Sequence, residues 1–224
     1  MKKKLGTITV GQSPRNDVIP EMMEFLGDVD ILQAGALDGL SYNEILNLDV
    51  KDDDYILVSI LRDGRSVKFA ERHILHRLQG CIEKLENDGA DAILFICTGV
   101  FPDVFKSTKP LLYPQKIIHC VIPHLIGNGK LAVVVPHEEQ VNQSINKWQE
   151  IGMDVDVVSG SPYSKTDEIS DVIAKLNKSD AQVVMMDCIG YTSEMKKRVV
   201  EGTGKSLILA RTFVSRVLGE LLNS

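Results

Sequence analysis

A series of short apolar runs, separated by stretches with helical spacing, constrains the fold of this sequence most. Within each run the apolar residues are consecutive, so both faces of the strand should be buried. Such strands are typical of parallel sheets covered by helices. The pattern therefore predicts an α/β fold. The expected strands are residues 6–10, 29–34, 55–60, 92–97, 116–121, 131–136, 155–159, 183–187 and 206–210.

Other segments carry the apolar stripe of an amphipathic helix. They cover residues 67–87, 141–148 and 213–221, where apolar residues recur every three or four positions. Gly89 should end the first helix, because glycine readily adopts the left-handed backbone conformation found at helix ends.

Two of the expected strands end in the same turn, which reads Cys, one residue, then Gly. When the sequence is aligned with itself so that Cys97 meets Cys188, without a gap, Gly99 meets Gly190. Further identities are Lys84 with Lys175, Leu85 with Leu176, and Ala90 with Ala181. Both segments also read as helix, polar turn, buried strand and Cys-x-Gly. The sequence therefore predicts a duplication that produced two small doubly wound lobes.

Ligands of doubly wound sheets bind beyond the carboxyl ends of the strands, so we expect Cys97 and Cys188 on opposite walls of one cleft. A thiol at the start of a helix has a lowered pKa. Two such thiols flanking one carbon could remove a proton from one face and return it to the other, or act as nucleophile and acid. The alternative is that both are small core residues, as expected for Cys81 on a helix stripe and Cys120 inside a strand.

The loop "GQSPRND", Gly11–Asp17, directly follows the first expected strand. Ser13 followed by Pro14 is typical of a helix or turn start, while Pro20 places the start of the longer helix near Glu21. Exposed backbone amides, the Ser13 hydroxyl and Arg15 would together bind a carboxylate. The alternative is a plain surface loop.

Polar residues near the other strand ends extend this candidate site. Arg62 follows the strand at 55–60, and Arg62 or Arg65 could hold an anion, unless Asp63-Gly64 simply forms an exposed turn. Thr98 and Thr192 could offer hydroxyls near the two cysteines. Asp187 would raise the pKa of the neighbouring Cys188 thiol if it is close and ionised.

The composition narrows the class of protein. A net charge of −6 argues against a nucleic-acid partner. No apolar stretch approaches the roughly 20 residues of a membrane span, and no signal peptide precedes the first strand, so a cytoplasmic protein with reduced cysteines is expected. No zinc-binding spacing, P-loop or GxGxxG occurs, so no cofactor is expected.

Several motifs together resemble the AroM family over essentially the whole chain. They are "GQSPRNDVIPEM", "GALDGLS", "LVSILRDGRSV", "ICTGVFP", "SPY", "MDCIGYTSEM" and "TGKSLILART". The paired Cys turns also resemble the aspartate/glutamate racemase superfamily. That superfamily includes cofactor-independent racemases, hydantoin racemase, maleate isomerase and arylmalonate decarboxylase.

This resemblance implies two pseudo-symmetric α/β lobes, with Cys97 and Cys188 facing the substrate and Gly11–Arg15 binding it. The first lobe would comprise residues 1–105 with about 208–224, and the second residues 106–207. The C-terminal helix, about 211–222, would cross back onto the first lobe. In the racemases the first turn commonly reads Cys-Asn-Thr, whereas this chain has Cys97-Thr98-Gly99. The expected substrate-binding residues are Gln12, Ser13, Arg15, Arg62, Thr98, Gly99, Gly190, Tyr191 and Thr192.

The expected function is that of a cofactor-independent racemase, isomerase or lyase acting on a small carboxylate. The family name suggests a link with aromatic amino-acid metabolism. A non-catalytic ligand-binding or regulatory protein on the same fold is the alternative. The expected partners are the small carboxylate and, as an option, a second copy of the chain in a homodimer.

Overall fold

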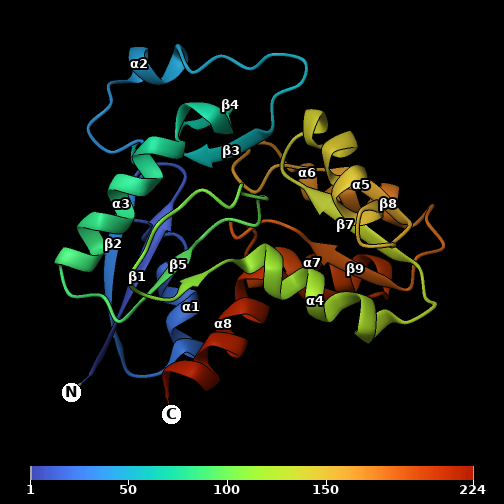
Figure 1. Cartoon of the computed structure of the whole chain (residues 1–224). Coiled ribbons are helices and arrows are strands. Elements are labelled where there is room, and N and C mark those ends of the chain that lie inside the picture. The colour runs from blue at the N-terminus through green and yellow to red at the C-terminus, as the bar shows by residue number, and fades with distance from the viewer. Residues whose placement is uncertain (1, 224) are drawn as a thin grey trace. The chain divides into compact units, whose positions relative to one another are not determined.

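The computed structural model describes residues 2–223, and these residues form two compact units (Figure 1). The first unit comprises Met1–Pro114 and Ser215–Ser224, and the second comprises Gln115–Val214. Each is built on a parallel sheet with helices packed against it. The α/β fold predicted from the consecutive apolar runs is therefore confirmed.

The first unit holds a parallel sheet of order β2-β1-β5-β6 and a separate antiparallel hairpin, β3-β4. Its strands are β1 (Lys3–Thr9), β2 (Val29–Gly35), β3 (Ile56–Ile60), β4 (Ser66–Ala70), β5 (Ala92–Phe95) and β6 (Leu111–Leu112). Its helices are α1 (Ile19–Leu26), α2 (Tyr42–Leu46), the 3-10 turn η1 (Glu71–His73) and α3 (Leu75–Asn87).

The second unit holds a parallel sheet of order β10-β9-β7-β8. Its strands are β7 (Leu131–Val135), β8 (Val155–Ser159), β9 (Val183–Met186) and β10 (Ser206–Leu209). Its helices are α4 (Pro114–Ile126), the 3-10 turn η2 (Glu138–Gln140), α5 (Val141–Gln149), α6 (Glu168–Leu176) and α7 (Ser193–Thr203). The last helix, α8 (Ala210–Leu222), begins in the second unit and ends in the first.

The two sheets share one topology. In the first unit β1 lies between β2 and β5, and β6 pairs with the far side of β5. In the second unit β7 lies between β8 and β9, and β10 pairs with the far side of β9. Cys97 follows β5 and Cys188 follows β9, so the two thiols come after corresponding strands. This correspondence confirms the two lobes of matching topology that the repeated turns predicted.

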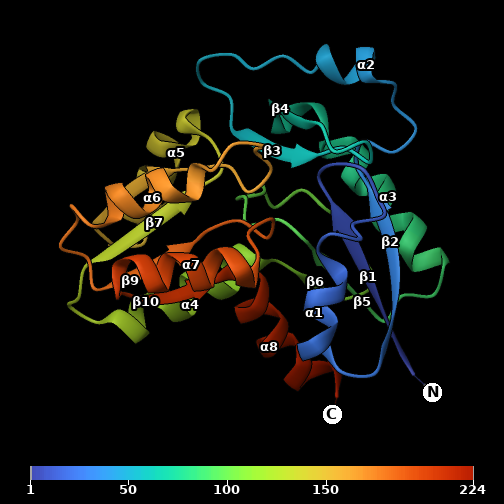
Figure 2. The same cartoon turned by 180° about the vertical axis from the view of Figure 1, so that it is seen from behind.

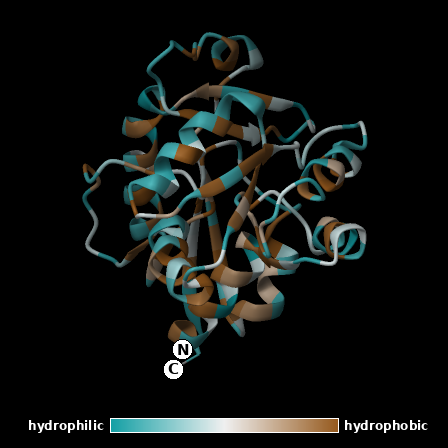
Figure 3. Cartoon of the chain, turned by 90° about the vertical axis from the view of Figure 1, so that its right-hand side faces the viewer, coloured by the Kyte–Doolittle hydropathy of each residue, from teal (hydrophilic) through white to brown (hydrophobic). Residues whose placement is uncertain are grey.

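Helices cover both sheets with their apolar faces. In the first unit α3 lies against the sheet (Figure 1), and its Leu78, Ile82 and Leu85 belong to one buried cluster with Ile8 of β1 and Phe95 of β5. In the second unit α6 and α7 lie over one face of the sheet, seen from behind in Figure 2, and α4 lies on the other face. The ribbon is mainly brown along the strands and largely teal over loops and the outer turns of helices (Figure 3). Among residues 2–223, every helix is too short or too polar to span a lipid bilayer.

The C-terminal helix was correctly predicted, and its last turns are anchored within the first unit. The Arg216 guanidinium lies 4.0 Å from the ring centre of Phe25, at the end of α1. The Asn223 side chain donates a hydrogen bond to the carbonyl oxygen of Leu26 at 3.1 Å. These contacts hold the end of α8 against α1.

The predicted helix at residues 67–87 is wrong in its first part. Residues Ser66–Ala70 form β4, and the helix α3 begins only at Leu75. Val67 and Phe69 are buried while Ser66 and Lys68 are exposed, which is the alternation of a strand with one buried face. The apolar positions of β4 happened to continue the helical stripe. Gly89, with φ of +88°, does end α3 as predicted.

The run at residues 55–60 was expected in the parallel sheet, but it forms β3 of the antiparallel hairpin. The turn of this hairpin is at Leu61–Arg65, where the Leu61 amide donates to the Arg65 carbonyl oxygen at 2.8 Å. Gly64 has φ of +83°, a conformation that favours glycine. The Asp63-Gly64 turn that the sequence indicated therefore reverses the chain and prevents a parallel crossover.

The strand predicted at residues 116–121 is also wrong, because this run lies within α4. Ile118 and Ile122 are buried while Lys116 and Cys120 are exposed, so burial recurs four residues apart, as on one face of a helix. Cys120 accordingly lies on an exposed helix face instead of inside a strand. The expectation that it is a core residue is wrong as well.

Candidate functional site

The two Cys-x-Gly turns have matching local geometry. The Gly99 amide donates to the sulfur of Cys97 at 3.4 Å, and the Gly190 amide donates to the sulfur of Cys188 at 3.3 Å. Both cysteines are partly exposed and unoxidised. Backbone N–H groups that point at an acceptor favour its anionic form. Glycine after the intervening residue thus marks a shared N–H···S turn.

A tyrosine that was not among the predicted site residues lies beside the second turn. The hydroxyl of Tyr163, in the loop between β8 and α6, is 4.0 Å from the sulfur of Cys188. A Cβ atom added to Gly190 would lie 2.3 Å from the same hydroxyl oxygen, so the absence of a side chain makes room for Tyr163. Its signal in the sequence was the motif "SPY". Tyr163 is a candidate proton donor or acceptor beside the thiol.

The backbone of the second turn is held by a buried guanidinium. Arg211 at the start of α8 is 1% exposed, and it donates to the carbonyl oxygens of Ile189 at 2.8 Å and Gly190 at 3.1 Å. The Tyr191 amide donates to the carbonyl oxygen of Cys188 at 3.3 Å. Arg211 was not recognised from the sequence, although it lies in the motif "TGKSLILART".

Two of the predicted substrate-binding residues in the second unit already use their hydroxyls in hydrogen bonds within the chain. Tyr191 is fully buried and donates to the carbonyl oxygen of Gly160 at 2.6 Å, and burial raises its pKa well above the ordinary value. Thr192 is the N-cap of α7 and accepts from the Met195 amide at 3.2 Å. Both residues stabilise the turn and the helix that follows it.

Only one of the two turns leads into a helix. After Cys188 the chain enters α7 at Ser193, as predicted. After Cys97 it continues through buried Thr98 into an irregular segment that reaches β6, so the expected helix start at this cysteine is wrong. The amide of Val100 instead donates to the hydroxyl of Tyr55 at 3.0 Å, which fixes the segment after the first turn.

Asp187 and the neighbouring Cys188 contact different helices of the second unit. Cys188 packs with the residues of α6 and α7, whereas Asp187 is buried and forms an ion pair with Lys147 of α5. Burial, and then the Lys147 charge, lower the pKa of the nearby His119 to about 4, so this imidazole is neutral at neutral pH. The charge of Asp187 is thus balanced by Lys147 and not by histidine.

The loop Gly11–Asp17 of the first unit is organised by Asp38. This carboxylate accepts from the amide and hydroxyl of Ser13, from the Gly35 amide and from the guanidinium of Arg62. Ser13 is therefore not a helix cap, since α1 begins only at Ile19. Asp38 was not predicted as a site residue, although it lies in the motif "GALDGLS".

The expected free anion-binding groups of this loop are largely occupied. The Ser13 amide donates to Asp38, and the Arg15 amide donates to the side-chain oxygen of Gln33 at 2.8 Å. Arg15 is 4% exposed, and its guanidinium forms a bidentate pair with Asp17 at 2.8 and 2.6 Å. The amides are not exposed as predicted, because neighbouring side chains of the same unit accept from them.

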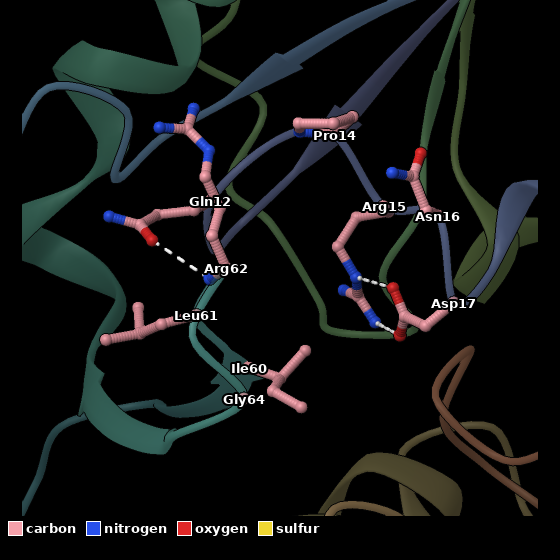
Figure 4. A pocket seen from close by; sticks show the side chains of 9 residues that line it. All are labelled: Gln12, Pro14, Arg15, Asn16, Asp17, Ile60, Leu61, Arg62 and Gly64. Atoms are coloured by element: carbon pink, nitrogen blue, oxygen red, sulfur yellow. Dashed lines mark hydrogen bonds and ion pairs between the residues drawn. The ribbon is translucent and has the colours of Figure 1, made fainter.

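Arg62 is the exposed cation of the candidate anion site. It lies in the turn after β3, a strand outside the parallel sheet, but its side chain reaches the loops that follow β1 and β2 at the carboxyl edge of that sheet. Its guanidinium donates to the carbonyl oxygen of Ser13 and to Asp38, and its amide donates to Gln12 at 3.1 Å (Figure 4). Arg65 instead pairs with Asp63 and lies 3.5 Å from the ring centre of Tyr42.

A pocket of about 360 Å³ lies beside these residues, entirely within the first unit (Figure 4). The structure brings predicted residues together here, because Gln12, Arg15 and Arg62 all line it. Cys97 follows β5, and the loop Gly11–Asp17 follows the neighbouring parallel strand β1. Both therefore lie at the carboxyl edge of one sheet. Among residues 2–223, no cluster of three or more His, Cys, Asp or Glu side chains could hold a metal ion.

A comparison with known protein families agrees with the resemblance that the sequence motifs indicated. The family model described as AroM protein matches residues 5–222. The chain belongs to the AroM family. No curated protein sequence matches this AroM-family protein.

Solved structures of low sequence identity share its fold. Maleate isomerase from Pseudomonas putida has a TM-score of 0.64 at 12% identity, covering 100% of this chain and 94% of the isomerase. Aspartate racemase from Picrophilus torridus has a TM-score of 0.63 at 10% identity, covering 99% and 94%. Unliganded arylmalonate decarboxylase has a TM-score of 0.61 at 10% identity, covering 99% and 92%. The AroM-family chain thus has the fold of the aspartate/glutamate racemase superfamily, as its motifs predicted.

Proposed function

We propose that this protein is a cofactor-independent racemase, isomerase or lyase acting on a small carboxylate, with Cys97 and Cys188 as its acid–base pair. The observation that carries the proposal is the repeated N–H···S turn. Gly99 and Gly190 donate to the two sulfurs at 3.4 and 3.3 Å, after corresponding strands of sheets with one topology. Two independent core cysteines would have no reason to share this geometry.

The proposed chemistry needs only these two thiols and a bound carboxylate. One thiolate accepts the proton from the substrate carbon and becomes a thiol. The other thiol gives its proton to the opposite face of the same carbon and becomes a thiolate, so the proton count is conserved and the centre is inverted. In a lyase, departure of carbon dioxide would leave the carbanion, and one thiol would protonate it.

The proteins of similar fold support this class of reaction. They include an isomerase, a racemase and a decarboxylase, whose names refer to maleate, aspartate and arylmalonate. Each name denotes a small carboxylate. We propose that Arg62, held by Asp38 and half exposed at 52%, meets the substrate carboxylate beside the pocket of the first unit. The family name adds shikimate-type and aromatic acids to the candidate substrates.

A non-catalytic ligand-binding protein is the second candidate, and one observation favours it. Arg15 is paired with Asp17, and the amides of Ser13 and Arg15 already donate within the chain. A substrate would therefore find fewer free donors at this loop than the sequence indicated. Such a protein would bind its ligand in both cysteine variants with little change.

The test is turnover and solvent-proton exchange over a panel of dicarboxylates, amino acids, arylmalonates and shikimate-type acids. Cys97→Ser and Cys188→Ser should each melt normally and abolish turnover, because serine is far harder to deprotonate than a thiol of pKa about 8.5. A single variant of a racemase should retain one-sided deuterium exchange without inversion. Cys120→Ser, on an exposed helix face, is the matched control and should turn over normally. A folded Cys97 or Cys188 variant with wild-type turnover would exclude the paired-thiol mechanism.

A further inference from the structure

We infer that Arg211 is a positioning residue that acts on the Cys188 thiol through a single peptide group. The guanidinium Nε donates to the carbonyl oxygen of Ile189 at 2.8 Å. The amide of the same peptide group belongs to Gly190 and donates to the Cys188 sulfur at 3.3 Å. A buried cation and the proposed catalytic sulfur therefore lie at opposite ends of one peptide dipole.

The planarity of the peptide group makes this arrangement effective. In a trans peptide the C=O and N–H bonds point in opposite directions and share conjugated electrons. A positive group at the oxygen withdraws electron density and makes the N–H a stronger donor, as in cooperative chains of hydrogen bonds. Arg211 also donates to the carbonyl oxygen of Gly190 at 3.1 Å, so its planar fork fixes the orientation of the turn on both sides of Gly190.

The position of Arg211 is not explained by stability of the helix. Arg211 is the second residue of α8, where the helix dipole is positive and a cation is unfavourable. Its side chain is also 1% exposed, and burial of a charge is costly unless hydrogen bonds compensate for it. The carbonyl oxygens of the Cys188 turn supply that compensation. Arg211 therefore stabilises the turn at Cys188 more than it stabilises α8.

Other charged and titratable groups of the second unit surround this turn. The Tyr163 hydroxyl is 4.0 Å from the sulfur, and Tyr191 lies at the end of the turn. Asp187 is paired with Lys147, and Glu168 accepts from the Ser161 amide. The Arg211 variants keep all of these residues. The comparison with Cys97, together with the melting curves, then separates loss of the guanidinium from a general change of structure.

The experiment measures alkylation of each cysteine by iodoacetamide, from about pH 6 to pH 10, with Cys188 and Cys97 followed separately by peptide mass spectrometry. In Arg211→Gln, the pH midpoint at Cys188 should rise and the rate at about pH 7 should fall by about twofold or more, as expected when the cation that strengthens the Gly190 N–H donor is lost. Arg211→Lys, which keeps the charge but not the fork, should show a smaller shift. Cys97 should be unaffected in both variants.

The matched control is Arg216→Gln, which removes an exposed arginine from the same helix and should leave both profiles unchanged. A Cys188 profile that overlays the wild type in a variant with a normal melting curve would overturn the inference. Equal shifts of the pH midpoint at Cys97 and Cys188 would also overturn the inference, because they would indicate a general loss of packing. If Arg211→Gln does not fold, the Arg211→Lys profile decides by the same criteria.

This inference deepens the proposed function, but the measurement uses no substrate. A protein that is inert on the whole substrate panel while Arg211→Gln shifts Cys188 would contradict the proposed catalysis and support the role of Arg211. Turnover that depends on Cys188 with no shift in Arg211→Gln would support catalysis and overturn the role of Arg211. The two failures are therefore distinguishable.

Discussion

The phenol of Tyr163 occupies the space that a side chain at Gly190 would need: a Cβ added there would lie 2.3 Å from the hydroxyl oxygen and 2.6 Å from the ring carbon Cζ. The same hydroxyl is 4.0 Å from the sulfur of Cys188. The glycine of the second turn thus serves two contacts at once. Its amide donates to the thiol, and its missing side chain admits the tyrosine.

The first prediction follows from this contact. Gly190→Ala should lower the free energy of unfolding by about 1–3 kcal/mol, because Tyr163 must move. Gly99→Ala should cost less, since its Cβ would meet the Leu57 side chain at 3.1 Å, the Cys97 sulfur at 3.4 Å and the Tyr55 ring at 3.6 Å, with no contact under 3.0 Å. Denaturant titration of both variants measures the difference. Tyr163→Ala should partly rescue Gly190→Ala, and equal losses at the two glycines would contradict the account.

The second prediction concerns Asp38, which holds the loop and Arg62. Asp38→Ala should destabilise the protein by about 1–3 kcal/mol, because Ser13 and Arg62 lose a charged acceptor. It should also weaken binding of small carboxylates, measured by calorimetry. Asp63→Ala is the matched control, since its pair with Arg65 is exposed and should contribute little to stability. Equal losses in the two variants would show that Asp38 has no special role.

The third prediction uses the buried carboxyl group of Glu71. Burial raises the pKa of Glu71 from 4.5 to about 7, and its Oε1 has no hydrogen-bond partner among residues 2–223. Between these two pH values the unfolded chain has lost this proton while the folded chain keeps it. The contribution of Glu71 to stability therefore falls as the pH rises through this window and stays low above it.

Glu71→Gln should remove this penalty. The variant should be more stable than the wild type by about 1 kcal/mol at pH 8, allowing for partial exposure of the group, and little changed below pH 4.5. Melting curves at the two pH values measure the effect. A stability gain of equal size at both pH values would show that ionisation of Glu71 is not its cause.

The fourth prediction concerns the buried pair of Lys147 and Asp187, whose charged atoms are 2.5 Å apart. Lys147→Met should cost about 3–5 kcal/mol, because it removes the cation that faces a buried carboxylate. The double variant Lys147→Met with Asp187→Leu should recover much of this loss, since it removes the buried carboxylate as well. Denaturant titration of both variants is the measurement. A double variant no more stable than Lys147→Met would contradict this explanation.

The fold could be predicted from the sequence wherever burial produced an unambiguous pattern. Consecutive apolar residues marked β1, β7 and β9, and the alignment of Cys97 with Cys188 indicated the two lobes whose sheets share one topology. Prediction failed at residues 66–70 and 116–121. In the first, a strand with one buried face matched a helical stripe by coincidence. In the second, the consecutive apolar residues of α4 read as a buried strand.

The candidate site could be predicted only in part, because several of its residues act through partners far away in the sequence. The cysteine turns were visible as repeated local motifs. Arg211 and Asp38 were not, since their importance comes from carbonyl and amide groups that only the folded chain brings near them. Arg15 was expected to meet a ligand, but Asp17 two residues later pairs with it. The sequence showed which polar groups were present, but not which of them already form hydrogen bonds or ion pairs within the chain.

The most direct test of the central claim asks whether Cys97 and Cys188 flank one substrate-sized space, and it needs no knowledge of the substrate. Dibromobimane, which joins two thiols separated by several ångströms, is applied to the folded Cys120→Ser protein, because Cys120 is exposed. The buried Cys81 should not compete, since burial raises its pKa to about 11.

If the two thiols flank one space, one bridge per chain should form between the peptides of Cys97 and Cys188, within the monomer. Introducing Cys97→Ser into the same protein should abolish the bridge and leave only a singly attached reagent. Independent single adducts on Cys97 and Cys188 of a folded protein, with no bridge at any reagent concentration, would contradict the account.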